Sequence, residues 1–106
     1  MEFRSIIERA LEVREKYQKL EKKKYGKEWT SSQIMQGFVG DVGDLMKLAM
    51  AKDKIRDIEN VDDKLAHELS DCLWSILVLS NKYNIDIEKE FLETMDSLEK
   101  RIKEDV

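Results

Sequence analysis

Two pairs of acidic residues stand three positions apart within segments that otherwise have the pattern of apolar helices. One pair, Asp41 and Asp44, lies in "GFVGDVGDLMKLAM", and the other, Glu68 and Asp71, lies in "HELSDCLW". Residues three apart are neighbours on one face of an α-helix. Because aspartate is a poor residue for a helix interior and burial of a charge is costly, these pairs call for a chemical explanation.

The apolar positions around each pair indicate where the acids point. At about 100° per residue, Asp41 falls within the apolar arc of its helix and Asp44 at the edge of that arc, which comprises Phe38, Val42, Leu45, Leu48 and Ala49. The second pair belongs to a segment, "CLWSILVL" and its flank, that is apolar almost all round and therefore marks a central helix. Two pairs on two helices give up to four carboxylates that could converge.

Converging carboxylates repel one another, so either some of them are protonated or a cation joins them. Oxygen ligands suit hard cations such as Mg²⁺, Mn²⁺ or Ca²⁺, and Mg²⁺ commonly shares its ligand shell with phosphates. A divalent ion also activates water for attack on phosphorus. The spacing thus indicates a metal site, while a solvated acidic face is the alternative that spacing leaves open.

Helical periodicity predicts four helices joined by short turns, and so an all-α, antiparallel four-helix bundle. The expected segments are about 3–24, from 31–33 to about 52, from about 62 to about 83, and a last helix after Asp86 with an apolar face of Ile87, Phe91, Leu92, Met95, Leu98 and Ile102. Gly26 is expected to end the first helix. Asp62 and Asp86 are expected to cap the third and fourth, and Thr30 with Gln33 fits a capping box for the second, although Ser31 or Ser32 could equally cap it.

Length and composition limit the classes of protein that the chain can represent. A length of 106 residues predicts a single domain, 1–106, and the net charge of −4 argues against a nucleic-acid polymer as partner. No apolar run is long enough to cross a membrane, and the single Cys72 excludes an internal disulfide, so we expect a buried thiol and a cytoplasmic location. One small bundle cannot cover a third helix that is apolar all round, so we expect a homodimer or tetramer.

The sequence resembles the MazG-like nucleoside triphosphate pyrophosphohydrolases over roughly residues 29–101. The resemblance lies in "DVGDLMKLA", "HELSDCLWSILVLSNKYNID" and "FLETMDSLEKR". It implies an all-α, MazG-like four-helix bundle that forms oligomers. It also implies Mg²⁺-dependent hydrolysis, with Mn²⁺ as a possible substitute, of a nucleoside triphosphate to monophosphate and pyrophosphate. Residue by residue, the four metal-binding acids of the family correspond to Asp41, Asp44, Glu68 and Asp71, of which Glu68 and Asp71 are the catalytic candidates.

Four further residues are candidates for substrate binding. Trp29 stands where relatives that act on deoxycytidine triphosphate have a base-stacking aromatic, with a lid packed on the core as the alternative. Lys82 continues the line of the second acidic pair and could meet a phosphate, or be a surface lysine. Lys100 and Arg101 are basic candidates for phosphate, with a solvated helix end as the alternative.

The chain also departs from the family pattern. Asp41 and Asp44 stand where the family usually has glutamate, Gly40 where some members have another acid, and Thr94 and Leu98 where some relatives have Lys and Asn. These departures motivate an alternative function, a non-catalytic helical oligomerisation module with a vestigial or structural metal site. A di-metal redox bundle would need Glu-x-x-His on two helices, and the chain has one histidine, His67.

Overall fold

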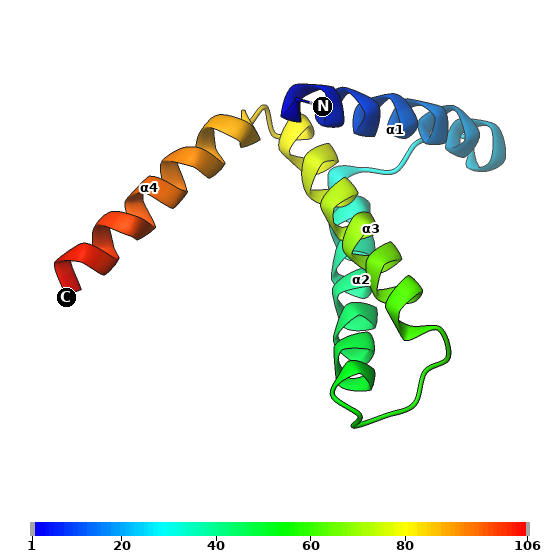
Figure 1. The fold of residues 1–106 in the computed structure, drawn as a ribbon. Helices are drawn as coiled ribbons and strands as arrows, with labels where there is room; N and C mark the ends of the chain where they lie inside the picture. Colours follow the sequence, from blue (N-terminus) through cyan, green and yellow to red (C-terminus); the bar gives the residue numbers. More distant parts are fainter. Residues whose placement is uncertain (1, 106) are drawn as a thin grey trace.

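A computed structural model describes residues 2–105, and within this range α-helices are the only regular secondary structure. The helices are α1 (Phe3–Tyr25), α2 (Ser31–Lys52), α3 (Val61–Lys82) and α4 (Ile87–Asp105) (Figure 1). The predicted all-α class with four helices is confirmed. In the described range, no helix has an apolar stretch of the length and composition that a membrane span requires.

The centre of the molecule is the pair formed by α2 and α3, which run side by side over most of their length (Figure 1). The buried core of this pair consists of Ile34, Val78 and Leu79, with Trp74 packed against it. Cys72 is buried and free, as predicted. The second half of α3 contains most of the buried residues in the chain, which confirms its expected central position.

Helix α1 lies across the carboxyl-terminal half of α3 and is fixed there by Trp74. The indole Nε1–H of Trp74 donates a hydrogen bond to the carbonyl oxygen of Ala10 at 3.0 Å. The ring of Tyr17 packs against the ring of Trp74 with centroids 5.5 Å apart and planes tilted by 52°, a favourable aromatic geometry. Helix α1 ends at Gly26, whose φ of 81° is the left-handed conformation that glycine adopts without strain.

The starts of α2 and α4 follow the predicted caps, whereas the start of α3 does not. The Thr30 hydroxyl accepts the backbone N–H of Gln33 at 3.2 Å, and the Gln33 side chain accepts the backbone N–H of Thr30 at 2.9 Å. Asp86 accepts from the backbone N–H of Lys89 at 3.2 Å. The prediction of Asp62 as a cap is wrong: Asn60, with a φ of 54°, precedes α3, and Asp62 in its first turn pairs with Lys52.

Helix α4 points away from the other three helices, so the four-helix arrangement is open within one chain (Figure 1). It is strongly amphipathic, yet none of its described residues is buried. The radius of gyration is 17.0 Å, against about 13 Å for a compact chain of this length. The apolar face of α4 therefore has no cover within the described chain.

The capping box at Thr30 yields a stability prediction. Thr30→Ala removes the side-chain acceptor for an otherwise unpaired N–H, so we expect the free energy of unfolding in urea to fall by about 1 kcal/mol. Ser32→Ala, at an exposed position inside the same turn, is the matched control and should change stability by less than about 0.5 kcal/mol. Equal losses in the two variants would show that the cap is not Thr30.

Candidate functional site

Three of the four predicted metal-binding acids converge where α2 packs against α3. Asp41, Asp44 and Glu68 each offer a carboxylate oxygen, and these oxygens all lie within 4.8 Å of one another. The i, i+3 spacing puts both aspartates on the side of α2 that meets α3, and the packing of the two helices brings Glu68 to them. This is the arrangement that the spacing of the acidic pairs predicts.

The close approach of these acids is electrostatically unfavourable in the absence of a cation. Burial, followed by the charges of Asp71 and Asp44, raises the pKa of Asp41. Burial, followed by the charges of Asp41, Asp71 and Asp44, raises the pKa of Glu68. Burial, followed by the charges of Asp41, Glu68 and Asp71, raises the pKa of the neighbouring Cys72 thiol. The neighbouring carboxylates thus make it harder for Asp41 and Glu68 to ionise.

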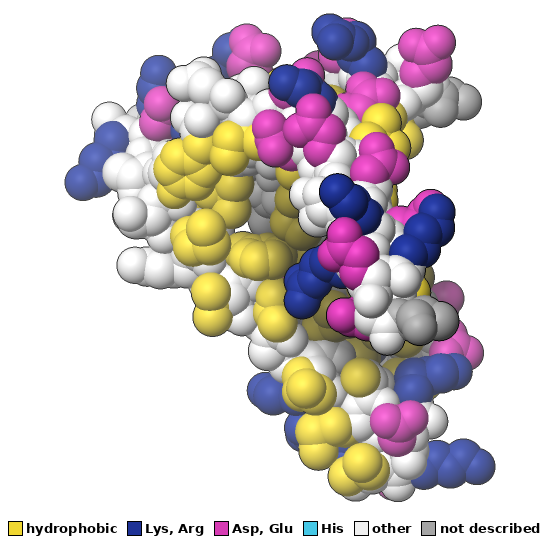
Figure 2. All heavy atoms as spheres, turned by 90° about the vertical axis from the view of Figure 1, so that its left-hand side faces the viewer, with side chains coloured by type: hydrophobic (Ala, Val, Ile, Leu, Met, Phe, Trp, Pro, Cys, Tyr) yellow, Lys and Arg dark blue, Asp and Glu magenta, His cyan; other side chains and the backbone are white. Residues whose placement is uncertain are grey.

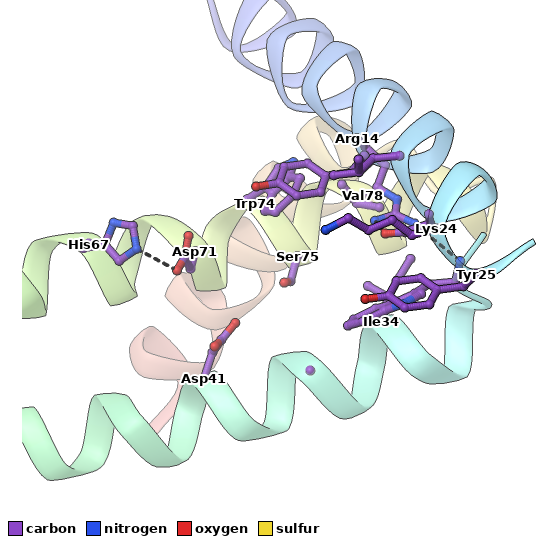
Figure 3. A pocket seen from close by; sticks show the side chains of 15 residues that line it. Arg14, Lys24, Tyr25, Ile34, Asp41, His67, Asp71, Trp74, Ser75 and Val78 are labelled. Atoms are coloured by element: carbon purple, nitrogen blue, oxygen red, sulfur yellow. Dashed lines mark hydrogen bonds and ion pairs between the residues drawn. The ribbon is translucent and has the colours of Figure 1, made fainter. Parts of the chain in front are cut away.

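Asp71 lies beside this cluster and has a partner of its own. Its Oδ2 is 3.1 Å from the Nε2 of His67, one helical turn earlier on α3 (Figure 3). In Figure 3, Asp41 on α2 points toward α3, where Asp71 lies. The sequence favours a structural or supporting role for His67 over a ligand role, and its i, i+4 spacing to Asp71 agrees with this contact. His67 thus orients the fourth acid rather than joining the cluster.

The residues present fit a hard divalent cation. The donors are all carboxylate oxygens, which Mg²⁺ and Mn²⁺ prefer. One of them, Oε2 of Glu68, is buried and has no hydrogen-bond partner in the described chain. A buried charged oxygen without a partner is costly, and a cation among the three carboxylates would satisfy it.

A cavity of about 490 Å³ opens beside the acids, between α1 and the α2–α3 pair (Figure 3). Asp41, His67 and Asp71 line one end of it. Four aromatic residues from α1, the linker and α3 contribute to the rest of its wall: Tyr17, Tyr25, Trp29 and Trp74. The wall also includes Ile34 and Gly37 of α2 and the charged residues Arg14, Glu21 and Lys24 of α1. With a divalent cation at its acidic end, this cavity would suit a ligand that has a phosphate group and a planar ring.

A second cavity, of about 470 Å³, lies against the other members of the acid cluster. Its charged lining consists of three acids, Asp44, Asp63 and Glu68, and two lysines, Lys47 and Lys64. His67 lines both cavities, so the acids stand between them. Positive side chains beside carboxylates would favour an anion that arrives with a metal ion.

The four predicted substrate-binding residues fall at different places. Trp29 lines the aromatic cavity. Lys82 lines a separate hollow behind Arg14, where its charge acts on Glu21 rather than on the acid cluster. Lys100 and Arg101 are exposed on α4 and line neither of the two cavities beside the acids. Within one chain, the structure brings only Trp29 near the site.

The sequence analysis missed a buried ion pair on α1. Arg14 and Glu21 stand seven residues apart, two turns along one face, and both are buried. The spacing was a signal, but α1 reads as a helix with one charged face, which is usually solvated. Both residues line the aromatic cavity.

The fold and the site define an all-α protein with a carboxylate cluster between two helices and an aromatic cavity beside it. The model of the MazG nucleotide pyrophosphohydrolase domain family matches residues 29–105. The chain therefore belongs to this family, as the sequence resemblance predicted. Comparison with curated proteins and with solved structures gave no match.

The raised pKa of Glu68 predicts how the metal-free protein responds to pH. The folded state holds the Glu68 proton more tightly than the unfolded state, whose pKa is near the ordinary value of 4.5. Stability from this group is therefore fully present below that value and is lost as pH rises through the raised pKa. Asp41 acts in the same direction.

We expect urea unfolding in a chelator to show that stability falls from pH 4.5 upward, and that Glu68→Gln reduces the fall. At neutral pH the metal-free Glu68→Gln protein should then be more stable than the wild type. Glu59→Gln, at an exposed position before α3, is the control and should follow the wild type. A Glu68→Gln protein less stable than the wild type at neutral pH would contradict the repulsion within the cluster.

Proposed function

We propose that the protein is a Mg²⁺-dependent nucleotide pyrophosphohydrolase that cleaves a nucleoside triphosphate to a monophosphate and pyrophosphate. The observation that carries this proposal is the convergence of Asp41, Asp44 and Glu68 within 4.8 Å, beside an aromatic cavity that Asp41 also lines. Membership of the MazG family supports the same reaction class.

The acids would act together on the ion and the phosphates. Asp41, Asp44 and Glu68 would hold Mg²⁺, with Asp71 beside them. When bound, the ion supplies charge neutralisation of the phosphates and a more acidic water. Glu68 or Asp71 would accept a proton from the attacking water, and His67 would hold the Asp71 carboxylate in place. Asp71, which also faces the aromatic cavity, is the nearer of these two acids to a bound nucleoside.

The two cavities suggest how a nucleotide would lie. The base and sugar would enter the aromatic cavity, where Trp29 and Trp74 present ring faces or edges. The triphosphate would then cross the acid cluster, and its far end would reach the cavity lined by Lys47 and Lys64. This orientation would place the bond between the first and second phosphorus at the acids, so that pyrophosphate leaves toward the lysines.

The proposed reaction predicts pyrophosphate release from at least one nucleoside triphosphate. A panel of ordinary, deoxy and damaged nucleoside triphosphates with Mg²⁺ or Mn²⁺ would be assayed for released pyrophosphate. Glu68→Gln and Asp71→Asn should lower turnover by about two orders of magnitude or more, because each removes a carboxylate from the charged centre. Circular dichroism should show an unchanged helix content.

The controls for these variants are the same chemical changes at exposed loop positions, Glu59→Gln and Asp57→Asn. Both should keep wild-type turnover. No pyrophosphate from any nucleotide would refute the proposed reaction, and full activity in Glu68→Gln or Asp71→Asn would refute the roles given to these acids.

The alternative function is a non-catalytic assembly module with a structural metal site, which the exposed apolar surface favours. Titration calorimetry with Mg²⁺ and Mn²⁺ separates the two functions when it is combined with the pyrophosphate assay. Metal binding without pyrophosphate release would support the module. Absence of metal binding would exclude both proposed uses of the acids.

We also propose that the chain forms a homodimer or tetramer through its exposed apolar surface. The accessible surface is 8499 Å², against about 6,200 Å² for a compact monomer of this mass. The excess of roughly 2,300 Å² is within the range that one partner of an obligate interface buries. Figure 2 looks at the side from which α4 projects and shows hydrophobic side chains gathered there. Exposed members on α3 and α4 are Leu69, Leu73, Ile76, Phe91, Leu92, Met95, Leu98 and Ile102.

Light scattering at micromolar concentration should therefore give a mass two or four times that of the 12.5 kDa chain. Met95→Lys, which places a charge on the apolar face of α4, should shift the mass toward the monomer. Ser97→Lys adds the same charge at an exposed position about 200° around the helix and should leave the mass unchanged. A strictly monomeric wild type would contradict the proposed assembly.

A further inference from the structure

The buried ion pair of α1, Arg14 and Glu21, has a geometry that holds both side chains rigidly. The Arg14 guanidinium donates two parallel hydrogen bonds to the Glu21 carboxylate, at 2.9 Å and 2.6 Å. The two side chains are 8% and 9% exposed, so water competes little for either. A bidentate pair of this kind fixes the carboxylate in orientation as well as in position.

The same carboxylate holds the start of the linker between α1 and α2. Oε1 of Glu21, which already accepts one Arg14 bond, also accepts the backbone N–H of Trp29 at 2.8 Å. The Trp29 ring then lies over Gly37 of α2, where a Cβ would be 3.6 Å from the ring carbon Cζ3. Trp29 is thus fixed at its backbone by α1 and supported at its ring by α2.

The charge balance around Glu21 keeps it ionised. Burial alone would raise the pKa of Glu21, but the Arg14 hydrogen bonds, the Trp29 N–H and the charges of Arg14 and Lys82 together lower it. A charged carboxylate is a stronger acceptor for the Trp29 N–H than a neutral one. Lys82 therefore contributes to this support from α3, rather than to the acid cluster.

A buried ion pair is a poor device for stability alone. Desolvation of the two charges commonly offsets their attraction, and apolar residues of similar volume often stabilise a protein as well or better. What apolar residues cannot provide here is an acceptor for the Trp29 N–H. Helix α1, which carries the pair, lies outside the matched residues 29–105.

We propose that the Arg14–Glu21 pair is a positioning device that holds Trp29 as one wall of the aromatic cavity and so sets the affinity for the nucleobase end of the substrate. The proposal rests on the proposed nucleotide function, because it takes the aromatic cavity as the base site. In this role α1 determines substrate binding without touching the reacting phosphates.

Two double variants separate positioning from packing. Arg14→Met with Glu21→Leu replaces the pair by apolar side chains and removes the acceptor for the Trp29 N–H. Arg14→Met with Glu21→Gln also removes both charges but keeps a carbonyl acceptor at the same position. Both avoid an unpaired buried charge, so both are expected to fold, and urea unfolding checks this. Glu12→Gln, in an exposed ion pair of the same helix, is the control.

Kinetics would use the nucleoside triphosphate that the wild type turns over fastest. The Leu-containing variant should raise KM about tenfold, the effect of losing one base-stacking contact, with kcat within about twofold of wild type. The Gln-containing variant and Glu12→Gln should keep KM within about twofold of wild type. An equal KM in the two double variants would overturn the proposal, because the acceptor would then have no role.

A second readout needs no turnover. The chain has two tryptophans, so 5-fluorotryptophan gives two ¹⁹F resonances, and Trp74→Phe assigns the one from Trp29. The Leu-containing variant should shift or broaden the Trp29 resonance, and the Gln-containing variant should leave it near its wild-type position. An unchanged Trp29 resonance in the Leu-containing variant would overturn the positioning role. A wild type that releases no pyrophosphate would instead overturn the proposed function, so the two failures are distinguishable.

Discussion

The packing of α2 against α3 is the contact on which the candidate chemistry depends, because it forces three carboxylates into one small volume. The apolar residues Ile34, Val78 and Leu79 supply the favourable part of this contact, and each buried side chain of that kind contributes about 1.5–3 kcal/mol. The acids supply the unfavourable part, which is visible in the raised pKa of Asp41 and of Glu68. A divalent cation would turn this repulsion into attraction, so the same packing that strains the metal-free protein prepares it to bind one.

The short side chains of Asp41 and Asp44 are compatible with binding of a divalent cation at this cluster. Aspartate is one methylene shorter than the glutamate usual in the family, which raises the question of whether the acids can meet at all. They do meet, since their oxygens and one from the longer Glu68 lie within 4.8 Å without any ion. The shorter acids stay on their own helix, and the single glutamate provides the reach from α3. With aspartate at both positions of α2, the gap is still closed, because Glu68 of α3 reaches across it.

Local patterns in the sequence predicted the features that depend on residues close together along the chain, such as helix ends and the acidic pairs. Gly26, Thr30 and Asp86 act at helix ends as their types and spacing indicated. The acidic pairs were also found from spacing, because three residues along a helix determine a shared face. Asn60 was missed since it precedes α3 without a side-chain hydrogen bond and so leaves no capping pattern to find.

Such local patterns could not predict contacts between segments that lie far apart in the sequence. The apolar face of α4 shows that it must be covered, but periodicity does not say by which chain, and in the structure the helix points away from its own (Figure 1). The bond from Trp29 to Glu21 was equally invisible, because it joins a linker backbone to a helix whose charged residues look solvated.

Helix α1 contributes to the aromatic cavity but not to the acid cluster. The acid cluster lies within residues 29–105, and its geometry depends on α2 and α3 alone. The far wall of the aromatic cavity comes from Tyr17, Glu21 and their neighbours on α1. Since α1 is anchored on α3 through Trp74 rather than through the acids, a change in α1 can reshape the cavity while the carboxylates stay in place. Under the proposed function, base selection would depend on α1, whereas the residues that hold the metal ion and the phosphates would lie on α2 and α3.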